Sequence, residues 1–167
     1  RKPFSASAVR SKLTGETPRA LTLEEIPQVQ DAFAQAAARA RKAGFDAVEI
    51  LGSAGYLISQ FLSPITNRRE DRYGGSLENR MRFGQEVVEK VRAAVGPDYP
   101  IIMRLAGNDF MPGGNRNREA RIFASVAEKS GVDLFNVTGG WHETRIPQLT
   151  MFVPRKAFVY LAQGIKA

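Results

Sequence analysis

The first strong pattern along the chain is an amphipathic stretch over residues 22–43. Apolar side chains recur every three or four residues, the period of a helix that buries one face: Ile26, Val29, Phe33, Ala36, Ala37 and Ala40. Thr22 and Glu25 form a capping box, since the hydroxyl can accept from the Glu25 backbone N–H and the carboxylate can accept in return. Gly44 follows as a C-terminal stop. The pattern predicts a helix over 22–43.

Strand-like and helical patterns alternate along the rest of the chain. Apolar residues over 100–105 are nearly consecutive, which is typical of a parallel strand buried on both faces. Residues 1–21 and 51–56 show neither period and are expected to be loops. The predicted strands cover 46–50, 100–105 and 134–137, and the further predicted helices cover 76–95, 118–130 and 154–165.

An internal repeat narrows the fold class. Residues 42–50 match residues 129–137, each reading as a helix end, a glycine stop, a turn with an aspartate and a strand. Alternating helices and strands require parallel pairing, in a doubly wound sheet or a (β/α)₈ barrel. No G-x-G-x-x-G motif follows a predicted strand, which counts against a doubly wound sheet of the dinucleotide-binding kind. A complete barrel needs about 250 residues. We therefore expect an α/β fold in which residues 1–167 form a single part of a (β/α)₈ barrel, with 1–21 as a loop lead-in. The chain is then expected to be a piece of a longer polypeptide.

Composition limits the possible chemistry. No cysteine and one histidine exclude disulfides and thiolate catalysis and leave too few ligands for a Cys/His metal site; the absence of cysteines fits a cytoplasmic protein. The sequence contains no run of about 18 apolar residues, the length that would predict a membrane-spanning helix. The net charge of +7, from 24 Lys+Arg and 17 Asp+Glu, is compatible with nucleic-acid binding. The arginines are dispersed, however, and many lie beside acids, as in 67–72. We therefore expect a small anionic ligand, such as a phosphate-bearing cofactor, and no nucleic acid.

Three side chains suited to redox or acid chemistry follow the predicted strands. Tyr56 lies after the first, Arg104 near the end of the second, and His142 after the third. The carboxyl ends of parallel strands meet at one edge, where α/β folds bind ligands. A tyrosine hydroxyl can donate a proton, a guanidinium can bind an anionic ring or phosphate, and an imidazole can donate to a carbonyl oxygen. Each residue also has a structural interpretation, as a packing ring, a salt bridge or a hydrogen-bonded histidine, and the pattern leaves both open.

A set of longer motifs resembles the old yellow enzyme superfamily of flavin oxidoreductases. The motifs are Gly44–Ile50, Gly55–Pro64, Thr66–Arg69, Tyr73–Ser76 and Glu78–Phe83. Within that superfamily, residues 51–56, 139–147 and 153–158 are similar to the bacterial 2,4-dienoyl-CoA reductases. The resemblance covers essentially the whole chain. We expect five residues of the stretch 66–80 to tie the long loop to the following helix rather than to contact substrate: Arg68, Arg69, Asp71, Asn79 and Arg80.

The resemblance implies that this chain supplies about strands four to six of a barrel that binds FMN. The family's proton-donating tyrosine corresponds to Tyr56, its partner histidine to His142 and its flavin-contacting arginine to Arg104, while Arg145 falls in a substrate-contacting segment. The implied activity is reduction of a conjugated C=C bond in an enoyl thioester or enone. Electrons would pass from NAD(P)H through FAD and a 4Fe-4S cluster, both outside this chain, to FMN. Three strands leave open sheet edges, so the isolated chain is expected to be inactive and to associate with itself or with the remaining barrel segments.

Some positions depart from the family pattern and leave alternatives open. Leu51 and Ala54 stand where trimethylamine-dehydrogenase-like enzymes carry a Tyr and a His, and where many simple members hold the substrate carbonyl. Ala54 and Ile65 stand where the dienoyl-CoA reductases carry a Glu and an Arg, which leaves the acyl-CoA substrate open. The alternatives to an ene or dienoyl reductase are a trimethylamine-dehydrogenase-like flavoenzyme, a non-catalytic barrel assembly module and a basic RNA-binding segment.

Overall fold

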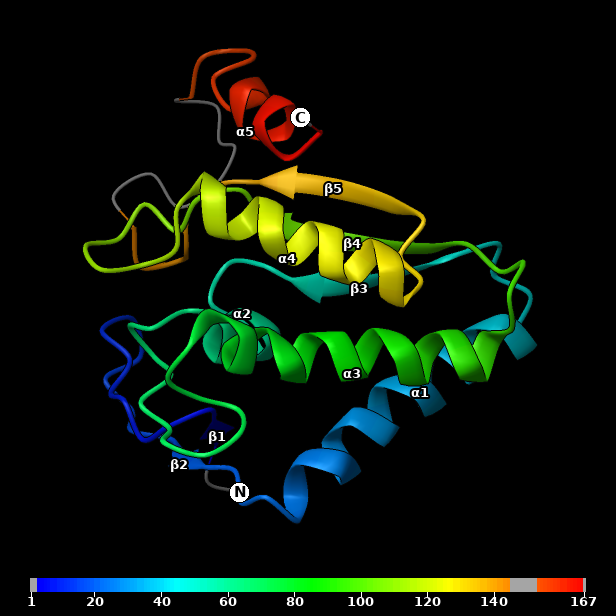
Figure 1. The fold of residues 1–167 in the computed structure, drawn as a ribbon, viewed down its shortest axis with the longest axis horizontal. Coiled ribbons are helices and arrows are strands. Elements are labelled where there is room, and N and C mark those ends of the chain that lie inside the picture. Colours follow the sequence, from blue (N-terminus) through cyan, green and yellow to red (C-terminus); the bar gives the residue numbers. More distant parts are fainter. Residues whose placement is uncertain (1–2, 145–152, 167) are drawn as a thin grey trace.

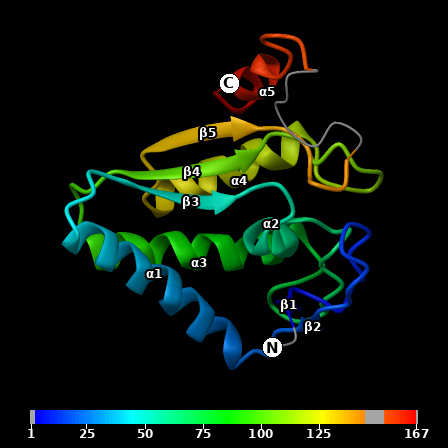
Figure 2. The ribbon, with the colours of Figure 1, turned by 180° about the vertical axis from the view of Figure 1, so that it is seen from behind.

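The computed structural model describes residues 3–144 and 153–166. Its centre is a three-stranded parallel sheet in chain order, made of β3 (Val48–Gly52), β4 (Ile101–Ala106) and β5 (Leu134–Thr138). The three long helices are α1 (Glu25–Lys42), α3 (Leu77–Val95) and α4 (Asn117–Ser130). In Figure 1, α4 lies in front of β4. In the view from behind, the strands lie in front of α4 (Figure 2). This helix therefore covers one face of the sheet.

The shorter elements lie at the margins of the sheet. They are β1 (Phe4–Ser5), β2 (Arg19–Ala20), α2 (Leu57–Leu62) and α5 (Val159–Lys166). The last helix lies beyond β5 and contacts α4 (Figure 1). No helix in the described part of the chain is long and apolar enough to cross a membrane.

The helix termini follow the local signals in the sequence. The capping box at the start of α1 forms, because the Glu25 N–H donates to Thr22 Oγ1 at 3.3 Å and the Thr22 N–H donates to Glu25 Oε2 at 3.0 Å. The Ser76 hydroxyl caps α3 by accepting from the Asn79 N–H. Gly96, with a φ of 80°, ends that helix in a conformation that favours glycine. These observations confirm the predicted helices over 22–43 and 76–95.

The two faces of the sheet are buried very differently. Ile50, Ile101, Met103 and Leu105 belong to one buried cluster with apolar residues of α3 and α4. Alternate positions face the other way, as a strand's period of two requires, and they are exposed or half-buried: Glu49, Leu51, Ile102, Arg104, Leu134 and Asn136. Doubly wound sheets carry helices on both faces, whereas a barrel has its helices outside. The architecture is therefore a partial (β/α)₈ barrel.

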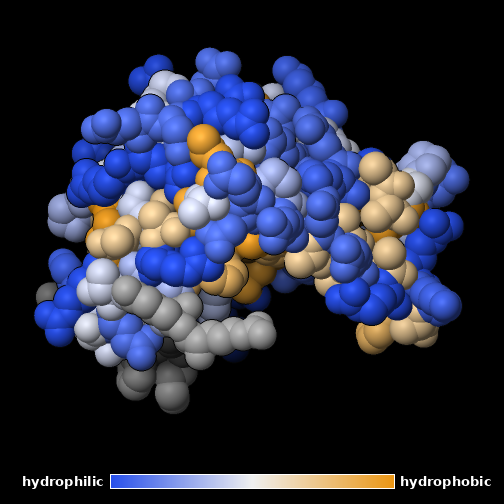
Figure 3. Space-filling view, turned by 90° about the horizontal axis from the view of Figure 1, so that it is seen from below, coloured by the Kyte–Doolittle hydropathy of each residue, from blue (hydrophilic) through white to orange (hydrophobic). Residues whose placement is uncertain are grey.

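Exposed apolar surface accompanies this half-covered sheet. Leu51 is 37% exposed and Leu134 is 55% exposed on the uncovered face. The space-filling view shows a mostly hydrophilic surface on which apolar side chains gather around a hollow (Figure 3). The prediction that 100–105 is buried on both faces was wrong for Ile102 and Arg104, because no described element covers their side of β4.

Three segments differ from the sequence-based expectations. The lead-in over 1–21 contains a parallel pair of two-residue strands, in which Phe4 aligns with Arg19. A six-residue helix, α2, follows Tyr56 directly; its buried residues pack under the sheet although the segment is too short for a clear helical period. The last helix begins at Val159 rather than Pro154, because Lys156 adopts a φ of 66°, a left-handed conformation that interrupts a right-handed helix.

Candidate active site

Arg104 lies on the uncovered face of the central strand, near its carboxyl end. The parallel register places it between Leu51 of β3 and Asn136 of β5. Its side chain is half-buried and makes no hydrogen bond or ion pair with any residue that the structure describes. The nearby carboxylate of Glu49 instead accepts from Asn136 Nδ2 at 2.9 Å. A half-buried guanidinium without a protein partner is poorly explained as a structural salt bridge and is suited to binding a ligand.

Tyr56 and His142 meet beyond the ends of β3 and β5. Their ring centroids are 5.2 Å apart, and the planes are nearly perpendicular at 88°, which is an edge-to-face contact. Tyr56 is 47% exposed, and its hydroxyl has no hydrogen-bond partner in the described ranges. The structure therefore brings together two of the residues expected from the sequence and leaves the phenol O–H accessible. Arg145, expected to contact substrate, lies outside the described residues.

The contact between these rings depends on an interaction between two distant loops. Ala54 and Trp141 form an isolated parallel bridge, and the His142 N–H approaches the Ala54 carbonyl at 3.4 Å. Gly55 packs against the indole so closely that a Cβ atom there would lie 2.9 Å from Trp141 Cε3. Its φ of 89° also favours glycine. Gly55 thus permits the approach that places Tyr56 beside His142.

Asp109, which the sequence analysis did not single out, anchors the indole. Its carboxylate accepts from Trp141 Nε1 at 2.9 Å, Ser63 Oγ at 2.7 Å and the Asn115 N–H at 2.7 Å. Burial raises the pKa of Asp109, and the three donors oppose that rise. The only signal in the sequence is an acid shortly after a buried strand. By holding Trp141, Asp109 fixes the loop that carries His142.

Two buried hydroxyls lie at the same edge of the sheet. Ser53 follows β3 directly and Thr138 ends β5, so the register places them on either side of Ala106. Ser53 is fully buried, Thr138 is 2% exposed, and neither hydroxyl oxygen has a partner among the described residues. Buried polar groups normally find partners. Like Arg104 and the Tyr56 hydroxyl, these two hydroxyls lie at this edge without partners among the described residues.

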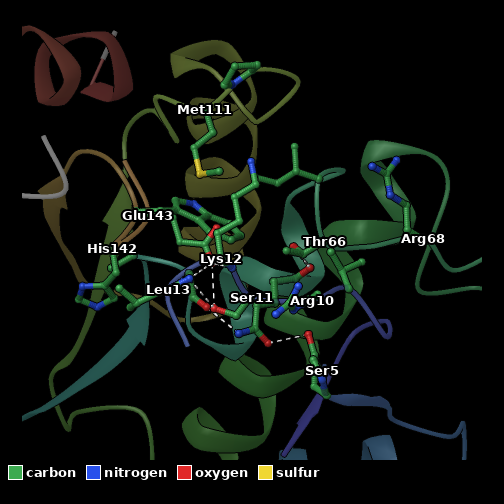
Figure 4. A pocket seen from close by; sticks show the side chains of 18 residues that line it. Ser5, Arg10, Ser11, Lys12, Leu13, Thr66, Arg68, Met111, His142 and Glu143 are labelled. Carbon is green, nitrogen blue, oxygen red and sulfur yellow. Dashed lines mark hydrogen bonds between the residues drawn. The ribbon is translucent and has the colours of Figure 1, made fainter. Parts of the chain in front are cut away.

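A cavity of about 390 Å³ is lined by His142. Its walls come from the N-terminal segment, from residues between 54 and 68, from residues 111–112 and from residues 141–143 (Figure 4). Glu143 joins two of these walls, because its carboxylate accepts from Ser11 Oγ at 2.9 Å and from the Lys12 N–H at 2.8 Å. The N-terminal loop is thus held against the segment that carries His142.

Comparison with known proteins places this chain in a family. Residues 3–161 match the model of the NADH:flavin oxidoreductase / NADH oxidase family. A protein named metal reductase from Desulforamulus reducens is 65% identical over 160 residues, covering 96% of this chain and 24% of the relative. A solved complex of 2-naphthoyl-CoA reductase with 2-naphthoyl-CoA has 38% identity and a TM-score of 0.93, covering 99% of this chain and 25% of that one.

The same coverage holds for another similar structure, histamine dehydrogenase from Rhizobium sp. 4-9. It shows 34% identity and a TM-score of 0.86, with 99% of this chain and 24% of that one covered. The chain thus spans about a quarter of the length of these relatives. Because the family match covers nearly all of the sequence, the chain belongs to the NADH:flavin oxidoreductase / NADH oxidase family of FMN-dependent enzymes.

Proposed function

We propose that this chain supplies the proton-donating side of the active site of a flavin-dependent reductase that acts on activated C=C bonds. The observation that carries the proposal is the edge-to-face pair of Tyr56 and His142 beyond the carboxyl edge of the sheet, where Arg104 lies near the end of β4 with no partner among the described residues. The substrate class is an enoyl thioester or an enone. The similarity to a reductase solved with a CoA thioester favours the thioester.

The residues at this edge fit FMN. Arg104 has a free guanidinium, which can form charge-assisted hydrogen bonds to the carbonyl oxygens or the anionic form of a flavin ring. The hydroxyls of Ser53 and Thr138 add polar groups without protein partners close by. When bound, FMN supplies the hydride. We propose that NAD(P)H reduces it through FAD and an iron–sulfur cluster located outside these residues.

Tyr56 is the proton donor in this proposal. Hydride addition to the β-carbon breaks the C=C π bond and leaves a negative charge on the enolate of the substrate. The Tyr56 O–H then protonates the α-carbon, so one hydride and one proton complete the new C–H bonds. The adjacent imidazole of His142 stabilises the phenolate that remains, and the exposed phenolate regains a proton from water.

Two other activities are favoured by specific similarities. Histamine dehydrogenase suggests amine oxidation, but Leu51 and Ala54 occupy the positions where the amine-dehydrogenase pattern places its Tyr and His. The metal reductase suggests electron delivery to a metal ion, which is substrate and not a resident cofactor. Electron transfer to a metal ion needs no proton on carbon. Removing the Tyr56 hydroxyl therefore distinguishes this activity from C=C reduction.

Tyr56→Phe in the complete protein tests the proposal, because the change keeps the ring and removes only the hydroxyl. We expect flavin reduction by NADPH to stay near normal, and reoxidation by a conjugated enoyl substrate to slow by roughly 10²–10⁴, the usual contribution of a general acid. His142→Ala should slow the same half-reaction, and the double variant should be little worse than the slower single one. Stopped-flow flavin absorbance measures both half-reactions. Equal slowing of both would indicate a displaced flavin and would contradict the proton-donor role.

A further inference from the structure

We propose that the cavity lined by His142 contains an anion subsite, formed by Arg10, Lys12 and Arg68, that binds the pyrophosphate of a CoA thioester. This inference rests on the proposed function, because the reacting end of that thioester would lie at His142, whose ring contacts that of Tyr56. It goes further by assigning the opposite end of the ligand to residues of the N-terminal loop and of the loop after α2.

The three cations line one cavity although they come from distant parts of the chain. Arg10 and Lys12 lie on the N-terminal loop, and Arg68 follows α2 by six residues. In Figure 4, Lys12 and Arg10 lie between His142 on one side and Arg68 on the other. The volume of about 390 Å³ falls within the usual range of small-molecule sites. A ligand that reacts at His142 could therefore extend past Lys12 and Arg10 toward Arg68.

The charges on this wall are not neutralised within the described structure. The side chains of Lys12 and Arg68 make no hydrogen bond or ion pair with described residues, and Arg10 uses only its Nε, which donates to the Gly15 carbonyl at 2.8 Å. Glu143 is the one acid among the described lining residues. Its carboxylate is already occupied by Ser11 Oγ and backbone N–H groups of the same loop. The wall therefore presents an excess of positive charge to any ligand.

A pyrophosphate suits this arrangement better than a single carboxylate would. The CoA thioester of the proposed reaction carries an adenosine-linked pyrophosphate remote from the reacting atoms. Several cations spread along a cavity can contact its separate phosphate oxygens. The cations are exposed, so each contact contributes modestly and the attraction weakens with salt. The chemistry that the cavity would recognise is thus the ADP-type group of the thioester.

The test compares ADP with adenosine as probes, using isothermal titration calorimetry on the complete protein. The variant Arg10→Gln/Lys12→Gln/Arg68→Gln removes three charges from the cavity. A matched control, Arg39→Gln/Lys42→Gln/Arg118→Gln, removes three exposed charges from α1 and α4. We expect the parent to bind ADP more tightly than adenosine. The cavity variant should lose about tenfold or more in ADP affinity, since each exposed charge contact changes affinity by a few-fold. The control variant should bind ADP as tightly as the parent.

Equal ADP affinity in the parent and the cavity variant, or no preference for ADP over adenosine in the parent, overturns the subsite. Coenzyme A is then titrated in the same way. A loss of coenzyme A affinity in the cavity variant supports the subsite as the place of the CoA thioester, whereas an unchanged coenzyme A affinity overturns it. Flavin content distinguishes the failure of the two proposals. If the parent binds FMN but the cavity variant keeps the parent's ADP affinity, only the subsite is rejected. If the parent does not bind FMN, the proposed function is rejected, and the ADP comparison still tests the subsite.

Discussion

The loop between α2 and α3 and the carboxyl edge of the sheet both carry arginines but use them in opposite ways. In the loop, Arg69 donates to Asp71 at 2.6 Å and to the backbone carbonyls of Ala6 and Leu21 at 3.0 and 2.6 Å. At the edge, Arg104 has no partner among the described residues. The number of hydrogen-bond partners within the described structure thus distinguishes an arginine that stabilises the fold from one whose guanidinium is available to a ligand.

The contrast is sharpest between neighbours in the sequence. Arg68 and Arg69 are adjacent, yet the first lines the cavity with a free guanidinium and the second is 8% exposed and bonded to three segments. Burial raises the pKa of Asp71, but Arg69 and the Tyr73 N–H outweigh this effect, so the net shift is downward.

The expected link between this loop and the following helix is made by Arg80 of α3, which donates to the carbonyls of Leu62 and Gly75. Arg69 instead ties the loop to the N-terminal segment, and the Arg68 side chain has no partner among the described residues.

Arg69→Ala gives the largest expected effect in this comparison. It leaves the half-buried Asp71 and two buried carbonyls without their donor, and each buried acceptor left without a partner costs about 1–3 kcal/mol of folding free energy. Urea unfolding of the complete protein measures this loss. Arg68→Ala is the matched control and should change stability by less than about 0.5 kcal/mol. Similar losses for both would mean that the partner count does not separate the two roles.

Arg104→Ala should act on the cofactor rather than on the fold. Loss of charge-assisted bonds worth about 1.5–3 kcal/mol each should weaken FMN retention by at least tenfold. The urea midpoint of the apoprotein should stay near that of the parent, because no described residue loses a partner. Flavin absorbance after dialysis measures the first quantity. Unchanged flavin content with a collapsed urea midpoint would show instead that Arg104 is structural.

The pH-dependent part of the Asp109→Asn effect is the smallest expected change; the variant also loses a constant amount of stability, because an amide N–H₂ cannot accept the bonds that one carboxylate oxygen accepts. Because the folded-state pKa of Asp109 is raised, its contribution to stability is full below the ordinary aspartate pKa and is lost as pH rises through the raised value. The amide cannot ionise. The free-energy difference between variant and parent should therefore shift in favour of the variant across that window, by at most about 1.4 kcal/mol per pH unit.

Urea unfolding of both proteins over a pH series measures this difference. Taking the difference removes the opposite trend of Asp71 and Asp133, whose lowered pKa values make stability fall with decreasing pH. A pH-independent difference would show that Asp109 keeps the same charge in the folded and unfolded states throughout the range.

The sequence by itself determined the elements and the chemistry at the strand ends. Capping residues, glycine stops and apolar periodicity are local signals, and they predicted α1, α3, α4 and the three strands to within a few residues. The alternation of helix and strand required parallel pairing, which brought Tyr56 and His142 to one edge. The expectation that the protein binds a flavin came from the resemblance of its motifs to a known family.

Only the tertiary structure decided which polar residues are used and which are free. The Asp109–Trp141 hydrogen bond, the close approach of Gly55 to the indole and the different roles of Arg68 and Arg69 depend on contacts between segments far apart in sequence. The same is true of α2, whose six residues are helical because they pack against the core rather than because of their period. Local patterns carry no information about such contacts, because hydrogen-bond partners are chosen by which chain segments meet in space.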